Sequence, residues 1–341
     1  MNEAQELMKT REPVKTREPM KVRIGIGLGA WPFGAVRPGD VLDFIDRCEA
    51  LDIDSIWLSD RIVSEYDHLE AVTFMAFMAA RMENMMLGTS VLVLPARNPV
   101  VLAKELATLD VLSGGRILPA VGLGPADSAD FQATGVRREE RGRRTDEAIR
   151  LMRRLWTEDR VTFEGQFYSV KDVSINPKPY RAGGLPIWIG GRTDAAVKRV
   201  GRLGDGWLVS SITVEEVGKG IEAVRRYASE FGRSVPEDHY GVYLSYLITD
   251  DLEGGLSASR PYLHPRPDVP DAEISAIGTP EMVRARVRQY MEVGVTKFVM
   301  RPACSGDDWY RQLELLAREV IAPLQTPFSP EERLKRAAIP G

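Results

Sequence analysis

The feature that most constrains the fold of this chain is a repeated alternation of short β-branched runs with longer amphipathic stretches. The short runs are bounded by Gly, Pro, Asp or Ser, and the longer stretches carry apolar residues at helical spacing. Eight such strand–helix units follow Met20. Alternating strands and helices build a parallel sheet, and eight apolar strands predict an α/β protein with a closed (β/α)₈ TIM barrel.

The expected strands and helices have defined bounds. The strands are residues 22–28, 55–59, 86–92, 117–122, 186–190, 206–210, 241–248 and 297–301. The helices are residues 41–51, 69–82, 100–112, 141–156, 193–203, 214–231, 280–293 and 308–321. Pro99 and Pro280 suit the first turn of a helix, and Gly114 and Gly294 suit its end.

The domain organisation follows from the same pattern. Residues 21–325 form a single barrel domain, whereas residues 1–20 read as a disordered polar tail and residues 326–341 as a loosely attached one. Two excursions interrupt the repeat. Residues 161–179 begin with a hairpin that turns at Glu164–Gly165, and residues 249–277 are rich in Asp, Gly, Ser and Pro. The second follows a barrel strand, so we expect a mobile loop that acts as a lid on the active face.

Composition excludes several classes of protein. A formal charge of −4 and the lack of any nucleic-acid motif argue against a nucleic-acid partner. No apolar run is long enough to cross a membrane, and the polar N-terminus does not resemble a signal peptide. Two cysteines without metal spacing fit a reduced, cytoplasmic protein. The three histidines lack metal-pair spacing, so we expect no metal site.

The strongest site signal is the run IWIGGRT, which ends the fifth expected strand. Gly190 and Gly191 let the backbone approach a ligand, and Thr193 suits the start of the next helix. Free N–H groups at a helix start favour an anion, and the Arg192 guanidinium matches phosphate oxygens. We therefore expect a cofactor phosphate here. The alternative is that the glycines only make a tight turn.

Further candidate residues follow other strands, whose carboxyl ends form the active face of a barrel. Gly122 and Gly124 follow the fourth strand but lack the spacing of a dinucleotide fingerprint. Asp60 and Arg61 end the second strand, where they either contact a polar heterocycle or form ion pairs with each other or a neighbouring loop. His68 lies in the loop that follows, although a lone histidine is more often simply half-buried.

Aromatic side chains near strand ends suit a flat apolar pocket. Trp31 and Phe33 come after the first strand, and Trp207 lies in the sixth. They can equally belong to the core. His264 lies in the long loop on the active face, whereas His239 precedes the seventh strand at the opposite face.

Three motifs in order resemble a known family. They are GTSVLVLPARNPVVLAKELATLDVLSGGR from Gly88, ERGRRTDEAIRLMRRLW from Glu140 and PIWIGGRTDAAVKRVGRLGDGW from Pro186. They are similar to the luciferase-like monooxygenase superfamily, above all its probable coenzyme F420-dependent oxidoreductases. The resemblance implies a bacterial-luciferase-like barrel with insertions, usually dimeric, with FMN or coenzyme F420 at its mouth. It also implies a non-prolyl cis peptide at Ser90–Val91.

The resemblance assigns roles to individual residues. Asp60 matches an aspartate that contacts the ring system, and Gly190, Gly191 and Arg192 match the phosphate-binding turn. Candidate catalytic residues are Asp60, Arg61 and His68; candidate cofactor contacts are Asp60, Ser90, Val91, Gly122, Gly124, Gly190, Gly191, Arg192 and Thr193. Arg61 and Pro125 depart from the family, because better-known relatives keep a histidine and an acidic residue there.

Three functions remain open from the sequence. The leading hypothesis is F420-dependent hydride transfer to or from a small organic substrate, with the cofactor supplying the chemistry. The first alternative is an FMN-dependent monooxygenase that receives reduced flavin from a separate reductase and reacts it with O₂. The second is a non-catalytic flavin-binding protein, because no acid or base is evident and fold does not fix function. A separate flavin or F420 reductase and a second copy of the chain are expected partners.

Overall fold

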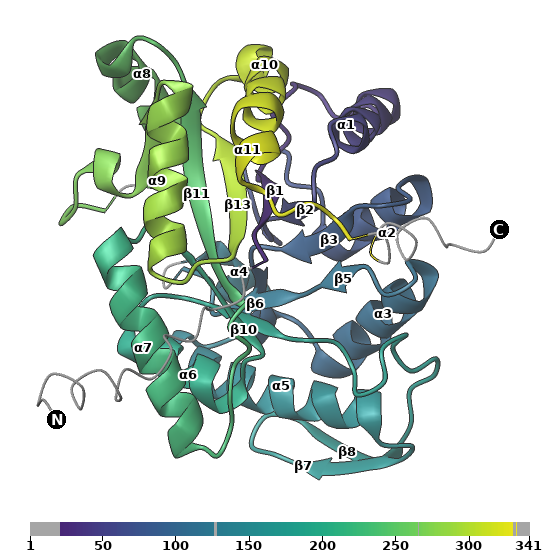
Figure 1. Cartoon of the computed structure of the whole chain (residues 1–341). Helices are drawn as coiled ribbons and strands as arrows, with labels where there is room; N and C mark the ends of the chain where they lie inside the picture. Colours follow the sequence, from purple (N-terminus) through teal and green to yellow (C-terminus); the bar gives the residue numbers. More distant parts are fainter. Residues whose placement is uncertain (1–20, 126–127, 265, 330–331, 333–341) are drawn as a thin grey trace, which may run out of the picture.

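The computed structural model describes residues 21–125, 128–264, 266–329 and 332 (Figure 1). Residues 1–20, for which a disordered tail is expected, and residues 333–341 lie outside the described residues. Parallel strands at the centre are surrounded by helices (Figure 1).

The strands close into a barrel. They are β1 (Arg23–Leu28), β2 (Ser55–Leu58), β3 (Met86–Thr89), β4 (Leu92–Val93), β5 (Ile117–Leu118), β6 (Ala120–Gly122), β9 (Trp188–Gly190), β10 (Gly206–Ser210), β11 (Tyr240–Ile248) and β13 (Lys297–Pro302). The third and fourth barrel strands are each split in two, so that β3 pairs with β5 and β4 with β6. β13 returns to β1, with Lys297 opposite Arg23. The predicted (β/α)₈ barrel is confirmed.

The helices match the expected positions, with additional short helices in the loops. They are α1 (Pro38–Ala50), α2 (Ala71–Arg81), α3 (Pro99–Leu112), α4 (Ala129–Ala133), α5 (Arg141–Thr157), α6 (Asp194–Leu203), α7 (Val214–Glu230), α8 (Leu252–Ser259), α9 (Pro280–Glu292), α10 (Gly306–Leu316) and α11 (Ala322–Leu324). Polar caps start several of them: Asn98 accepts from the Val100 and Val101 amides, and Thr213 forms a capping box with Glu216. Each cap contributes about 1 kcal/mol.

Large aromatic rings fill the barrel interior because neighbouring strands carry glycine. Trp57, Trp188 and Tyr243 belong to one buried cluster inside the sheet. A Cβ on Gly88 would lie 2.4 Å from the Trp57 ring, and one on Gly206 would lie 2.5 Å from the Trp188 ring. Real Cβ atoms do not come so close, so these two positions require glycine for the rings to fit.

The amino-terminal end of the barrel is closed by charged residues and by the end of the chain. Asp54 forms ion pairs with Lys297 and, at 3.5 Å, with Arg23. Arg23 donates to the Thr326 carbonyl oxygen at 2.6 Å and pairs with Glu332 at 3.0 Å. The expectation of a loosely attached segment 326–341 is therefore wrong for these two residues, because polar groups at the start of β1 bind them.

The two expected excursions differ in outcome. Residues 161–179 contain the predicted hairpin of β7 (Val161–Glu164) and β8 (Ser169–Val173), although the turn follows Glu164, which still pairs with Ser169. Residues 249–277, expected to form a mobile loop, contain a helix and a strand. Asp251 caps α8, and β12 (Ser275–Gly278) pairs with the end of β11. This edge is available because β11 extends past its other neighbours.

Candidate active site at the barrel mouth

The floor of the barrel mouth is formed around Val91. The Ser90–Val91 peptide is cis, as predicted, and lies between β3 and β4. A Cβ on Gly122 would lie 2.5 Å from Val91 Cγ2, and one on Gly190 would lie 2.9 Å from Cγ1. The two glycines therefore make room for the valine. The structure brings these four predicted cofactor-site residues together at the ends of adjacent strands.

The turn between β9 and α6 presents free backbone groups to solvent. Gly191 has a φ of +113°, and its carbonyl oxygen accepts a 2.9 Å hydrogen bond from Trp207 Nε1. Thr193 caps α6 by accepting from the Ala196 amide at 3.3 Å. Gly191, Arg192 and Thr193 are exposed. An exposed helix start with an adjacent guanidinium suits an anionic group.

Trp207 does not line this mouth. It is 1% exposed, and a Cβ on Gly220 of α7 would lie 2.2 Å from its ring, which places it between sheet and helices. Of the two interpretations of the Trp207 side chain, the one that places it in the core is correct.

The rings of Trp31 and Phe33 pack against each other with centroids 5.0 Å apart, next to Phe44. Gly124 has a φ of +69° and lies against Val93 of β4, the second half of the third barrel strand.

Asp60 is buried in an ion pair. Its Oδ1 accepts from Arg97 Nη2 at 2.6 Å, and its Oδ2 accepts from Arg97 Nε at 3.1 Å and from the Val93 amide at 2.9 Å. The Asp60 side chain is 0% exposed. Oδ2 thus holds the backbone just after the cis peptide, and both oxygens bind the Arg97 side chain. Arg97 also pairs with Glu70, which caps α2.

Arg61 points to a different loop from Asp60. Its Nη1 lies 3.4 Å from Ser128 Oγ and 3.8 Å from Asp130 Oδ2. The buried Asp130 also accepts from the Ile62 and Val63 amides, at 3.1 and 2.7 Å. The two charges at the end of β2 therefore pair with neighbouring loops and not with each other. Asp130 sets the position of the loop that carries Arg61.

His68, Arg61, His264 and Arg301 form a cationic cluster at the mouth. Arg301 Nη1 lies 3.2 Å from His264 Nε2, and His68 Nδ1 lies 2.9 Å from Ser64 Oγ. Burial lowers the pKa of both histidines, and the Arg61 and Arg301 guanidiniums lower it further. Both imidazoles are therefore neutral at neutral pH.

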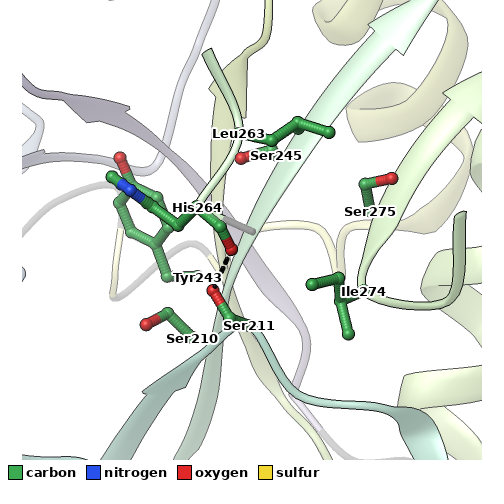
Figure 2. A pocket seen from close by; sticks show the side chains of 8 residues that line it. All are labelled: Ser210, Ser211, Tyr243, Ser245, Leu263, His264, Ile274 and Ser275. Atoms are coloured by element: carbon green, nitrogen blue, oxygen red, sulfur yellow. Dashed lines mark hydrogen bonds between the residues drawn. The ribbon is translucent and has the colours of Figure 1, made fainter. Parts of the chain in front are cut away.

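A hydroxyl-lined pocket lies beside this cluster. Its lining is Ser210, Ser211, Tyr243, Ser245, Leu263, His264, Ile274 and Ser275 (Figure 2). Ser211 Oγ donates to the His264 carbonyl oxygen at 3.0 Å and so holds the segment after α8 over the pocket (Figure 2). No sequence motif singled out Tyr243 or Arg301. The position of Arg301 at the end of the eighth strand was the signal that could have found it.

Three buried polar atoms near the ends of the first three barrel strands lack hydrogen-bond partners among the described residues. Among the described residues, Trp31 Nε1, Ser59 Oγ and Ser90 Oγ are buried without a hydrogen-bond partner. Ser59 and Ser90 follow β2 and β3, which are neighbours in the barrel. Buried polar groups are normally satisfied, so these atoms suit the polar edge of a bound heterocycle. The residues present therefore fit a flavin or deazaflavin.

Comparison with known proteins identifies the family. The family model described as luciferase-like monooxygenase matches residues 20–269. The chain belongs to this family. The predicted membership, and with it the prediction of an oxidoreductase, is confirmed.

Known proteins are similar over most of the chain. An F420-dependent glucose-6-phosphate dehydrogenase of Kineococcus radiotolerans is 34% identical over 85% of this chain and 94% of its own length. A solved F420-dependent secondary alcohol dehydrogenase in complex with an F420–acetone adduct has a TM-score of 0.76 at 20% identity, covering 90% of this chain and all of its own. The FMN-bound oxygenating constituent of 3,6-diketocamphane monooxygenase from Pseudomonas putida has a TM-score of 0.73 at 15% identity, covering 91% and 100%.

Two further findings concern the part of this luciferase-like chain that the structure describes. Within the described residues, no group of three or more His, Cys, Asp or Glu side chains is placed to hold a metal ion. In the same part of the chain, no helix combines the length and hydropathy needed to cross a membrane.

Proposed function

We propose that this oxidoreductase transfers a hydride between coenzyme F420 and a small organic substrate. The observation that carries the proposal is the mouth itself, where an exposed helix start, the Val91 floor and the unpartnered Ser59 and Ser90 hydroxyls lie at neighbouring strand ends. When bound there, the deazaflavin supplies hydride chemistry at C5. The curated relatives named F420-dependent favour F420 over FMN.

The phosphate end of the cofactor belongs at the start of α6. Gly191, Arg192 and Thr193 are exposed, and Thr193 caps α6 by accepting from the Ala196 amide. A phosphate there gains charge-assisted hydrogen bonds from amides and guanidinium. Gly122 and Gly124 border this region because β6 and β9 are paired.

The ring end belongs over Val91. Ser59 and Ser90 hold hydroxyls that can satisfy polar ring atoms. Asp60 contributes through Arg97 and the Val93 amide, because these hydrogen bonds fix the backbone that carries the floor. We assign Asp60 a positioning role in place of the predicted contact with the ring, because its side chain is 0% exposed and both of its oxygens accept hydrogen bonds from the protein. His68 and Arg61 remain the proposed catalytic residues on the substrate side.

FMN-dependent monooxygenation is the second candidate function. A solved structure with the same fold holds FMN, and the start of α6 would serve the phosphate of either cofactor equally well. In this case a separate reductase would supply reduced flavin. Titration of the purified protein with F420 and with FMN, followed by absorption and fluorescence, separates the two. F420 should bind more tightly, and failure of both cofactors to bind at micromolar concentration contradicts the proposal.

The variant Gly191→Asp tests the phosphate end. It places a carboxylate against the incoming phosphate and should abolish F420 binding while the barrel stays folded. Gly183→Asp is the matched control, because Gly183 also has a positive φ, of +91°, and an added Cβ would meet no atom within 4 Å, but it lies in the loop that precedes β9. Equal F420 affinity in the two variants would remove the phosphate role from α6.

We further propose that the enzyme works in the cytoplasm as a homodimer. Support comes from the exposed Phe77 of α2 and the exposed Val101 and Leu112 of α3, which are 44%, 54% and 72% accessible. Large apolar side chains on adjacent helices suit a protein interface. Both cysteines are free, as a reducing compartment maintains them. Light scattering after gel filtration should give twice the mass of one chain, 38.0 kDa.

A further inference from the structure

The charge of the Arg301 guanidinium is not balanced by a carboxylate among the described residues. Its hydrogen-bond partner is the neutral His264 ring, which accepts through Nε2 because arginine can only donate. Among the described residues, no ion pair joins Arg301 to a carboxylate. A Cβ added to Gly29 would lie 3.5 Å from Arg301 Nη2, so the guanidinium sits directly over the end of β1.

Arg61 adds a second, weakly compensated charge. Its single carboxylate partner among the described residues is Asp130, and that contact is long at 3.8 Å. Asp130 is already committed to the Ile62 and Val63 amides and to Ser128 Oγ. Arg61 therefore keeps most of its donors available at the mouth. Such bare guanidiniums are uncommon in a half-buried site unless a ligand completes them.

The surroundings of the two arginines are polar, and the residues that line the adjacent pocket include no carboxylate. The pocket beside them is lined by the hydroxyls of Ser210, Ser211, Ser245 and Tyr243. Hydroxyls can donate to an oxyanion without repelling it. Asp268, which follows the segment after α8, is bound by Arg266 in an ion pair.

We propose that the substrate of this enzyme carries a carboxylate or phosphate group that binds between Arg301 and Arg61, against the hydroxyl-lined pocket. The reaction of this substrate with F420 rests on the proposed function. The binding of its anionic group between the two arginines does not. The site is separate from the cofactor phosphate site, because Arg301 lies near the end of β13 and Gly191 follows β9. Bidentate guanidinium contacts give both affinity and orientation.

Binding of the anion also involves the segment after α8. His264 occupies one donor of Arg301 and is held by Ser211, while Arg266 pairs with Glu216 at 2.7 Å. An oxyanion that takes the Arg301 donor now bonded to His264 displaces the ring. In that binding mode, the segment predicted to act as a lid responds to the substrate through this one contact.

The three histidines allow a direct test by NMR. His68 and His264 flank the site, and His239 lies before β11 at the opposite end of the barrel, where Nδ1 lies 2.5 Å from the Asp205 carbonyl oxygen. A bound anion offsets the two guanidiniums and should raise the pKa of His68 and His264. The probes are inorganic phosphate and acetate at constant ionic strength, and His→Gln variants assign the signals. The His239 signal should not respond.

Arg301→Gln identifies the site, and Arg150→Gln is its control, since Arg150 is exposed on α5. Arg301→Gln should weaken the histidine response to phosphate about tenfold, as expected for one lost charge-assisted contact. Arg150→Gln should not change it. A response to phosphate but not acetate assigns a phosphate-bearing substrate, and the reverse assigns a carboxylate.

Two results would overturn the anion site. One is the absence of any histidine response to either probe. The other is a response that is lost in Gly191→Asp but kept in Arg301→Gln, which places the anion at α6. F420 binding is measured on the same proteins. If F420 binds but the histidines do not respond to the anions, only the anion site is contradicted. If the unmodified protein does not bind F420, the proposed function is contradicted.

Discussion

The two ends of the barrel differ in how their polar and charged groups are paired. At the amino-terminal end, Asp54 accepts from Ser55 at 2.8 Å and pairs with Lys297 and Arg23, so that the buried charges compensate one another. At the mouth, Ser90 Oγ has no partner among the described residues, and Arg301 interacts with the neutral groups His264 and Tyr243. One end therefore stabilises the fold, whereas the other keeps polar groups available for ligands.

The largest expected effect lies at the closed end. Asp54→Ala leaves Lys297 and Arg23 without their shared carboxylate in a buried site. We expect a loss of about 3–5 kcal/mol of unfolding free energy, as for other broken buried pairs. Urea unfolding followed by circular dichroism measures it, with the exposed Asp159→Ala as control. A loss no larger than that of the control contradicts the proposed division between the ends.

A smaller stability effect with a larger functional one is expected for Asp60→Asn. The neutral amide keeps the shape but weakens the hydrogen bonds from Arg97, which retains Glu70 as a second partner. We expect about 2 kcal/mol of lost unfolding free energy, typical of a charged hydrogen bond. F420 affinity should fall as well, because the backbone beside Val91 loses its anchor. Full affinity in a destabilised variant would show that Asp60 is only structural.

Ser55 and Ser90 allow a direct comparison of the closed end of the barrel with its mouth. Ser55 Oγ donates to Asp54 and accepts from Trp57 Nε1 at 2.9 Å, whereas Ser90 Oγ has no partner among the described residues. Ser55→Ala should cost about 1–3 kcal/mol, because the indole N–H is left unpaired. Ser90→Ala should change the unfolding free energy by about 0.5 kcal/mol or less but weaken F420 binding. Equal destabilisation by both variants would refute the contrast.

The smallest effect is a pH dependence of stability. The folded-state pKa of His68 and of His264 lies below the ordinary value of 6.5. The unfolded chain therefore takes up protons first as pH falls, and stability decreases from about pH 6.5 downwards, towards the folded-state pKa values. Urea unfolding at several pH values should show a shallower decrease in the double variant His68→Gln/His264→Gln. An unchanged slope would exclude these two groups.

Local patterns predicted most of the fold, and tertiary contacts decided the rest. The eight strands and the hairpin follow from apolar periodicity and turn residues. The segment 249–277 was misjudged because its Gly and Ser content resembles a loop, yet the free edge of β11 orders residues Ser275–Gly278 as a strand. Trp207 was ambiguous because the side chains of a barrel strand alternate between the two faces of the sheet, and its sequence neighbours do not state which one it occupies.

The sequence by itself determined the barrel, the family and the glycine turn before α6, since each depends on residues that are close together along the chain. Only the tertiary structure decided the partners of Asp60 and Arg61, and only it placed Arg301 beside His264. These pairs join residues from different strands and loops. Their distances depend on barrel closure, which no local pattern encodes.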